Sequence, residues 1–331
     1  FFYIFNNTTP ILTITSNDIT SGSTSNKDIF NFDFTASTSV TGFTSSDITV
    51  SGGTFDSLIP KPNNVFSSIL RPNISLGTIE ISIDSGACND SITGTSNVAT
   101  DTFTINYDKS RPALDLAANV TRGSSNSTYE VVIDISSTKN IVDFDKSKIS
   151  TNNCTIFKTR TLSLKNYKLF INPINNDIVS FNIPEGVFHD SFGNSNTELS
   201  GGVFEWTFDT QGVFIQLKTD DLEDNSGTTT NLQNINFVAE IDDDNEELVE
   251  NDLSFNNLTI DSFTKRAGLS IYDIVTKTST PGLIASLEIP ANVIQDAANN
   301  YNLASNLFSW TYDTSVPTVT ITSDDISSGD T

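Results

Sequence analysis

The chain has 331 residues, with 41 acidic and 17 basic side chains, a formal net charge of −24 and a sequence pI of about 4.1. This excess of acid repels nucleic acid and anionic lipid, which excludes non-specific binding to either. No apolar run reaches the roughly 18 residues that a membrane-spanning helix needs, so we expect no membrane span in this segment.

Short segments of alternating apolar and polar residues predict β-strands along the whole chain. Clusters of Gly, Pro, Asn and Asp separate these segments at spacings of about a dozen residues, and no window has a sustained helical stripe. The composition and the spacing predict an all-β chain of small β-sandwiches with about seven strands each. In chain order the clearest segments are 11–15, 29–35, 48–52, 78–83, 103–107, 129–135, 167–171, 204–208, 235–241, 283–289 and 308–312.

Related phrases recur about every hundred residues. "FTINYDKSRP", "FEWTFDTQGV" and "FSWTYDTSVP" each end a unit with an aromatic residue and Asp, and "PILTITSNDITSG" near the start returns as "PTVTITSDDISSG" near the end. A period of this length suits a sandwich domain better than a short solenoid repeat. We therefore expect three full units in a segment of a longer array. The predicted boundaries are 1–9 for the tail of a preceding repeat, 10–109, 110–210 and 211–314 for domains 1 to 3, and 315–331 for the start of a following repeat.

Three phrases resemble the bacterial-type Ig-like repeats of giant extracellular adhesins and surface fibres. They are "FDFTASTSVTGFTSSDITVSGGTF" at 32–55, "YDTSVPTVTITSDD" at 312–325 and the closing loop "EGVFHDSFGNSN" at 185–196. The first unit has all three phrases of that family, whereas the second and third keep only the opening and closing ones. The resemblance implies Ig-like sandwiches and an extracellular, cell-surface role.

The links between units, such as "DKSR", are too short to act as flexible tethers, so we expect the domains to stack end to end as a rod. This organisation predicts a structural, non-enzymatic protein that forms the shaft of a surface fibre, filament or adhesin. Its expected partners are copies of itself or a surface ligand. Two alternatives remain: an Ig-like module that binds a carbohydrate or protein ligand, and a non-catalytic spacer of a large secreted enzyme.

Recurring acidic residues predict calcium at the joints between domains. The link Asp, the residue eleven positions later and the closing loop are all expected at the end where two domains meet. Uncompensated carboxylates would repel one another there, and Ca²⁺ with its six to eight oxygen ligands would resolve the repulsion. The best site is expected at the second joint. The candidate ligands are Asp108, Asp190, Asp209, Asp220, Asp242 and Asp296. The alternative is that Asp and Asn lie in these loops because they form good turns.

The two cysteines, Cys88 and Cys154, fall in different units, which excludes a disulfide within one domain. They are either free, half-buried thiols or an intermolecular cross-link in an assembly. The single histidine, His189, is expected to be a loop residue rather than a catalytic base.

Asn-x-Ser/Thr sequons offer N-glycosylation sites if the host modifies Asn, although chance alone would give about nine in a chain of this composition. The candidates are Asn7, Asn73, Asn119, Asn126, Asn153 and Asn257, with further sequons at Asn6 and Asn89.

Overall fold

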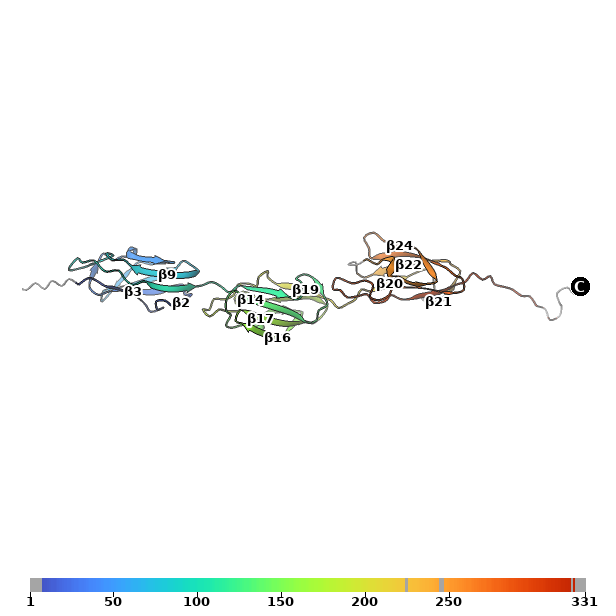
Figure 1. The fold of residues 1–331 in the computed structure, drawn as a ribbon, viewed down its shortest axis with the longest axis horizontal. Helices are drawn as coiled ribbons and strands as arrows, with labels where there is room; N and C mark the ends of the chain where they lie inside the picture. Colours follow the sequence, from blue (N-terminus) through green and yellow to red (C-terminus); the bar gives the residue numbers. More distant parts are fainter. Residues whose placement is uncertain (1–7, 224–225, 244–246, 323, 325–331) are drawn as a thin grey trace, which may run out of the picture.

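The computed structural model describes residues 8–223, 226–243, 247–322 and 324. They form three β-sandwich domains that follow one another along a single long axis (Figure 1). This arrangement confirms the predicted fold class of tandem Ig-like sandwiches stacked as a rod. Each domain has its own core, and the three cores draw their buried residues from within 12–107, 114–208 and 213–310.

The first domain packs two main sheets against each other. Its edges are broken into short pieces, including a small two-stranded sheet beside the closing loop. The first main sheet has the strand order β1 (Leu12–Ser16), β3 (Phe30–Ala36), β8 (Val65–Pro72), β6 (Gly53–Phe55), and β7 (Ile59–Lys61) also pairs with β8. The second main sheet has the order β2 (Thr24–Ser25), β11 (Phe103–Asp108), β9 (Leu76–Ile83), β5 (Ile48–Ser51). The small sheet pairs β10 (Asn89–Asp90) with β4 (Val40–Thr41).

The second and third domains share one simpler topology of two four-stranded sheets. In the second domain, the first sheet has the strand order β12 (Leu114–Ala118), β14 (Val131–Ser137), β17 (Asn166–Pro173), β16 (Cys154–Ser163). The second sheet has the order β13 (Ser125–Asn126), β19 (Phe204–Phe208), β18 (Asp177–Asn182), β15 (Ser150–Asn152). In the third domain, the first sheet has the strand order β20 (Ile215–Lys218), β22 (Asn234–Ile241), β25 (Ile271–Thr278), β24 (Leu258–Lys265). The second sheet has the order β21 (Ser226–Thr230), β27 (Phe308–Tyr312), β26 (Ile284–Glu288), β23 (Ser254–Asn256). Single 3₁₀ turns occupy Ser45–Asp47, Lys146–Lys148 and Glu250–Asp252.

Two features of chain direction place the joints. The last strand of each domain pairs in parallel with a short strand near that domain's start, as β11 does with β2, β19 with β13 and β27 with β21. The chain therefore enters each domain at one end and leaves it at the other. The closing loop, which lies between the last two strands, is at the entry end and faces the preceding domain.

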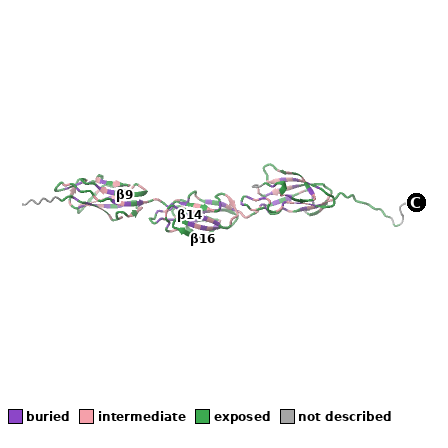
Figure 2. Ribbon diagram, viewed as in Figure 1, coloured by how far each residue is buried: buried purple, intermediate pink, exposed green. Residues whose placement is uncertain are grey.

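Buried and exposed residues alternate along the strands of both sheets (Figure 2), and the buried ones form the core of each sandwich. Trp206 and Trp310, at equivalent positions of the last strands, are 1 % and 0 % exposed, so both are core residues. The indole nitrogen of Trp310 donates a hydrogen bond to Thr278 Oγ1 over 3.2 Å. No helix among the described residues has the length and apolar character needed to cross a membrane.

The terminal segments differ from the sequence expectation. The pattern "TVTIT" at 318–322 resembles β1, yet residues 317–322 belong to no strand and are exposed. A strand requires a neighbour with which to share its backbone hydrogen bonds, and no described residue pairs with this segment. Residues 1–7, most of the predicted tail of a preceding repeat, lie outside the described residues.

Candidate functional site

The closing loop of the second domain is organised by one buried carboxylate. Asp190 Oδ1 accepts hydrogen bonds from the backbone amides of Phe192 and Asn194, each over 2.9 Å. Its Oδ2 accepts from Asn194 Nδ2 over 2.9 Å. Farther along the loop, the Asn196 side chain bonds to three backbone groups of the same loop. The Asp and Asn residues therefore do have the turn-forming role that the alternative interpretation assigned to them.

The third domain repeats this loop. Asp296 Oδ1 accepts from the amides of Ala298 and Asn300, each over 2.8 Å, and its Oδ2 accepts from Asn300 Nδ2 over 2.9 Å. Asn302 takes the place of Asn196, because it too bonds to carbonyl and amide groups across the loop.

The same loop also holds the preceding domain. Asn194 Nδ2 donates to the backbone oxygen of Asp108 over 3.0 Å, and Asn300 Nδ2 donates to that of Asp209 over 2.9 Å. A second contact repeats beside it, since Asn26 donates to Phe192 O over 2.6 Å and Ser127 donates to Ala298 O over 3.3 Å. The two joints are therefore built on one plan.

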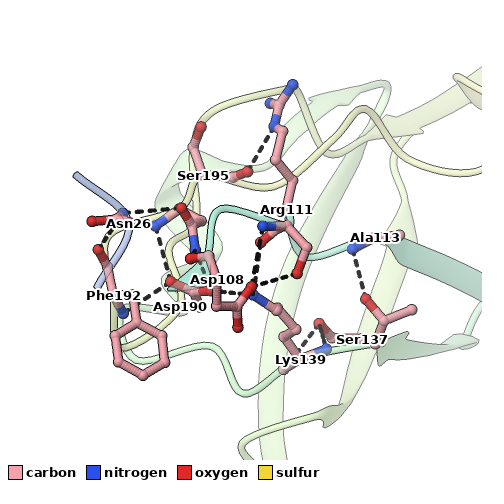
Figure 3. Close-up of polar contacts among 12 residues, drawn as sticks. Asn26, Asp108, Arg111, Ala113, Ser137, Lys139, Asp190, Phe192 and Ser195 are labelled. Atoms are coloured by element: carbon pink, nitrogen blue, oxygen red, sulfur yellow. Dashed lines mark hydrogen bonds and ion pairs between the residues drawn. The ribbon is translucent and has the colours of Figure 1, made fainter. Parts of the chain in front are cut away.

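The first joint adds a lysine to this plan (Figure 3). Lys139 follows β14, and its Nζ lies 2.7 Å from Asp108 Oδ1, 2.7 Å from Ser110 O and 2.9 Å from Asp190 Oδ2. The ammonium thus bridges the last strand of the first domain, the link and the closing loop of the second domain. Its side chain is 20 % exposed and that of Asp190 only 4 %, so water screens this cluster weakly.

Electrostatics at this cluster favours the charged forms. Burial by itself would raise the pKa of Asp108 and of Asp190, but the hydrogen bonds from Lys139 and from neighbouring groups outweigh it, and both pKa values fall below 3.8. Burial would likewise lower the pKa of Lys139, but its bonds to the two carboxylates raise that pKa above 10.5. All three groups therefore carry charge over a wide range of pH.

The second joint has no lysine at the corresponding place. There Asp209 Oδ1 accepts from the Gln211 amide over 2.9 Å, and the link then approaches the closing loop at Gly212. A Cβ added to Gly212 would overlap the carbonyl oxygen of Tyr301. At the first joint the position of Gly212 is taken by Arg111, whose guanidinium instead bonds to Ser195 O, Asn196 O and Glu185.

The six predicted metal ligands do not form one set. Asp108 and Asp190 meet at the first joint, but around Lys139, so this site does not fit a metal ion. Asp209 and Asp296 are linked through Asn300 at the second joint. Within the described ranges, no group of three or more Asp, Glu, His or Cys side chains lies close enough together to hold a metal.

The expected position of Asp220 is wrong. Ile215 of β20 pairs with Ile241 at the joint, whereas Lys218 pairs with Val238 farther down the domain. Asp220 follows Lys218 and therefore lies toward the opposite end of the sandwich from the second joint. A β-strand advances about 3.3 Å per residue, and the placement of Asp220 from the sequence did not account for the length of β20. Asp242 does lie at the joint end, where its Oδ1 accepts from the Phe214 amide over 2.7 Å.

Sequence reasoning places Asn194 and Asn300, which recur four residues after the loop Asp in both units, in the closing loop at the joint, and both side chains do bond to the preceding domain. It missed Lys139, which has no such repeat. Only an alignment of strand ends, which depends on the register of β14 and β22, places it beside the acids.

Both cysteine thiols lie inside the domain cores. Cys88 is 2 % and Cys154 7 % exposed, and neither forms a disulfide. Burial raises the pKa of both thiols, that of Cys154 to about 11, which suppresses the reactive thiolate. A cross-link between chains would require a sandwich to open, so the structure favours free thiols, more deeply buried than expected.

The sequons differ in accessibility. Asn73 is exposed, and Asn7 lies outside the described residues. The side-chain nitrogens of Asn119, Asn153 and Asn257 donate to backbone oxygens, which would compete with glycosylation. Asn126 uses its side-chain oxygen to cap the Thr128 amide.

His189 lies in the closing loop, as expected, and its Nδ1 is 2.9 Å from Asp143 Oδ2. Asp143 also accepts from the His189 amide and from Lys148. Burial opposes ionisation of Asp143, but these bonds lower its pKa to about 2.

Residues 6–107 match the family model described as the bacterial Ig-like domain, which confirms the resemblance seen in the first unit. No curated protein matches the chain. Among solved structures, the Escherichia coli adhesin FdeC has 10 % identity over 89 % of this chain and 96 % of its own, with a TM-score of 0.32. InvD of Yersinia pseudotuberculosis has 11 % identity over 88 % and 89 %, with a TM-score of 0.29, and titin domains I67–I69 have 7 % over 91 % and 97 %, with 0.34. Likeness at these levels supports no argument about what this chain binds.

Proposed function

We propose that this chain, whose residues 6–107 belong to the bacterial Ig-like domain family, forms a stiff extracellular shaft in a surface fibre, filament or adhesin. Its role is structural and not catalytic. The observation that carries this proposal is the repetition of one joint. The pair Asn194 and Asn300 and the pair Asn26 and Ser127 each make the same contact with a neighbouring domain.

Such a joint resists bending for a simple reason. The link between Asp108 and the first residue of β12 is short, and side chains from both neighbours bond across it. Each bond contributes about 1 kcal/mol, and several act at once on a link that has little freedom of its own. Ordered joints that repeat along a chain keep it extended and straight, so that anything the chain carries is held at a fixed distance and in a fixed direction.

We propose further that the second joint is stiffened by Ca²⁺. The chain places Asp242 directly after β22, at the end of the domain where Asp209 and Asp296 lie. Carboxylates and backbone carbonyl oxygens are the donors that Ca²⁺ uses, so the residue types present suit the ion. When bound, the ion would offset repulsion among these carboxylates.

Two measurements test this proposal. Negative-stain images of the purified chain are expected to show straight, thin single particles; thick regular filaments would indicate lateral assembly, and bent strings of beads would contradict the stiff shaft. Thermal unfolding with Ca²⁺ and with a chelator is expected to give a higher midpoint for the third domain with Ca²⁺. An unchanged midpoint would contradict calcium binding and leave the stiff shaft to be judged by the images.

A further inference from the structure

We propose that the exit end of the third domain is a docking surface for the closing loop of a further Ig-like sandwich. Residues 319–322, which run on beyond the third domain (Figure 1), supply the first strand of that sandwich. This inference rests on the proposed shaft, which it extends by one domain, and it needs no metal ion. Its support comes from the exit ends of the three domains, which are built alike.

The first step is the turn that follows the short parallel strand in each domain. In the first domain Ser25 Oγ accepts a hydrogen bond from the amide two residues later over 3.3 Å, and in the second domain Asn126 Oδ1 does so over 2.7 Å. In the third domain Thr230 Oγ1 accepts from the Leu232 amide over 3.1 Å. The same turn is therefore present at all three exit ends.

The middle residue of this turn contacts the next domain. At the first joint it is Asn26, which donates to Phe192 O over 2.6 Å, and at the second it is Ser127, which donates to Ala298 O over 3.3 Å. Both acceptors lie two residues after the Asp of the closing loop. In the third domain the middle residue is Asn231, which is exposed. Asn231 therefore offers, at the exit end, the same side-chain donor as Asn26.

The link that leaves each domain repeats as well. The Oδ1 atoms of Asp108 and Asp209 accept from the amide two residues later, over 3.1 and 2.9 Å. The backbone oxygen of each accepts from the loop asparagine of the next domain. Asp313 Oδ1 likewise accepts from the Ser315 amide over 2.8 Å, and the Asp313 amide donates to Thr230 O over 2.9 Å. The exit end of the third domain thus has both groups that hold the following domain at the two joints.

The residues after Asp313 have the spacing and the apolar pattern of a first strand. β12 begins six residues after Asp108 and β20 six residues after Asp209, and the first residue of each strand is buried. Six residues after Asp313 comes Val319, followed at the alternate position by Ile321. These two side chains are 86 % and 92 % exposed. A further sandwich would cover them with its sheet and its core, which is favourable for apolar side chains.

The contacts specify the loop that the partner must bring. It needs an Asp, a backbone oxygen two residues later for Asn231, and an Asn four residues later for the backbone oxygen of Asp313. The closing loops of the second and third domains have all three groups. The first domain has Thr95 at the position of Asn194, because the amide of the loop Asp donates to the backbone oxygen of each. Threonine has no side-chain amide, so the occupant is a following domain of the second or third type and not the first domain of a second copy.

An extended chain tests the proposal. Residues 1–322 are followed by residues 118–210, so that Val319–Thr322 replace the first four residues of β12 in a second copy of the second domain. Hydrogen exchange at the Leu232 amide, measured by mass spectrometry in a peptide that occurs once, reports on the exit end of the third domain. Relative to the unaltered chain, we expect exchange there to slow about tenfold, the effect of one to two net hydrogen bonds. The equivalent Thr128 amide, measured in the unaltered chain, is the reference for an occupied exit end.

Three variants of the extended chain identify the contacts. Asn231→Ala removes the side-chain donor, so most of the slowing at Leu232 should be lost. Asn231→Ser, which copies Ser127 of the second domain, should keep it. Asn194→Ala in the added copy alone removes the donor to the backbone oxygen of Asp313, and it should also abolish most of the slowing. Exchange in β25, a central strand of the third domain, is the control for folding.

A second extended chain separates docking from folding of the added domain. It joins residues 1–313 to residues 109–210, so that the added domain has its own link and first strand. In either chain, a gain in unfolding enthalpy equal to that of one domain shows that the added domain has folded. If only this second chain folds and slows exchange at Leu232, the docking surface stands, and the role of Val319 and Ile321 in a first strand is wrong.

Two results would overturn the docking surface. One is unchanged exchange at Leu232 in both extended chains with the added domain folded, and the other is equal slowing in the presence of Asn231→Ala and Asn194→Ala. Slow exchange in the unaltered chain that depends on protein concentration would show that a second copy occupies the surface, and it would overturn the proposed occupant. The shaft itself is judged separately, from the images of the unaltered chain.

Discussion

The two joints of this chain follow one plan and differ in how charge is balanced. At both, an Asp in the closing loop organises the loop, and an Asn beside it bonds to the preceding domain. At the first joint, Lys139 bonds to both carboxylates and the Arg111 guanidinium bonds to the closing loop. At the second joint, the equivalent positions are occupied by Asp243 and Gly212. The fold therefore determines where neighbouring domains meet, and the side chains at a few equivalent positions determine which interactions stabilise each joint.

The largest effect is expected from removal of the loop Asp. Asp190→Ala leaves two amides and the Lys139 ammonium without their partner in a weakly hydrated site, so we expect a loss of about 3 kcal/mol in the stability of the second domain. In the matched variant Asp296→Ala, measured in chelator, no bond to a lysine ammonium is lost, so we expect a smaller loss of stability in the third domain. Urea unfolding followed domain by domain gives both values, and equal losses would contradict the difference drawn between the joints.

Acid should open the first joint. The pKa values of Asp108 and Asp190 are lowered in the folded chain, so their contribution is complete above about pH 4 and is lost as pH falls through the lowered values. The pKa of Lys139 is raised, so its contribution is complete below 10.5 and is lost only as pH rises through that raised value. Exchange at Phe192 and Asn194, corrected for intrinsic rates, should be constant from about pH 5 to 9. A transition near neutral pH would show that other groups control this joint.

A smaller effect is expected from Gly212→Ala. The new methyl group would overlap the Tyr301 carbonyl oxygen, and the link must move away from the closing loop, at a cost of about 1–3 kcal/mol. Arg111→Ala is the matched change at the first joint, and it should cost less because the guanidinium is partly exposed. Thermal unfolding of both variants checks this order, and a harmless Gly212→Ala would mean that the close contact is not needed.

The smallest effect concerns the cores. Thr278→Val removes the acceptor of the buried Trp310 N–H without changing the size of the side chain, and we expect a loss of about 1–2 kcal/mol in the third domain alone. The second domain provides the comparison, because Trp206 is equally buried and its indole nitrogen has no hydrogen-bond partner among the described residues. An unchanged midpoint for the third domain would show that the hydrogen bond adds nothing to the burial of the indole.

The sequence predicted the repeated sandwich well because the alternation of residues and the recurring phrases around Asp108, Asp209 and Asp313 report directly on strands and links. It also identified Asp190 and Asp296 as joint residues. It failed on Asp220, whose position depends on how far a strand carries the chain, and on Lys139, whose neighbours are 31 and 51 residues away in the chain. Contacts of this kind depend on strand register, which a sequence pattern alone does not fix.

Small-angle X-ray scattering of the intact chain in Ca²⁺ tests most directly whether the domains form a stiff string through ordered joints. We expect one well-defined maximum dimension that equals the end-to-end length of the three domains in line, with the cross-section of a single sandwich. A broad distribution dominated by shorter dimensions, as given by domains on loose tethers, would contradict the ordered joints from which every prediction above proceeds.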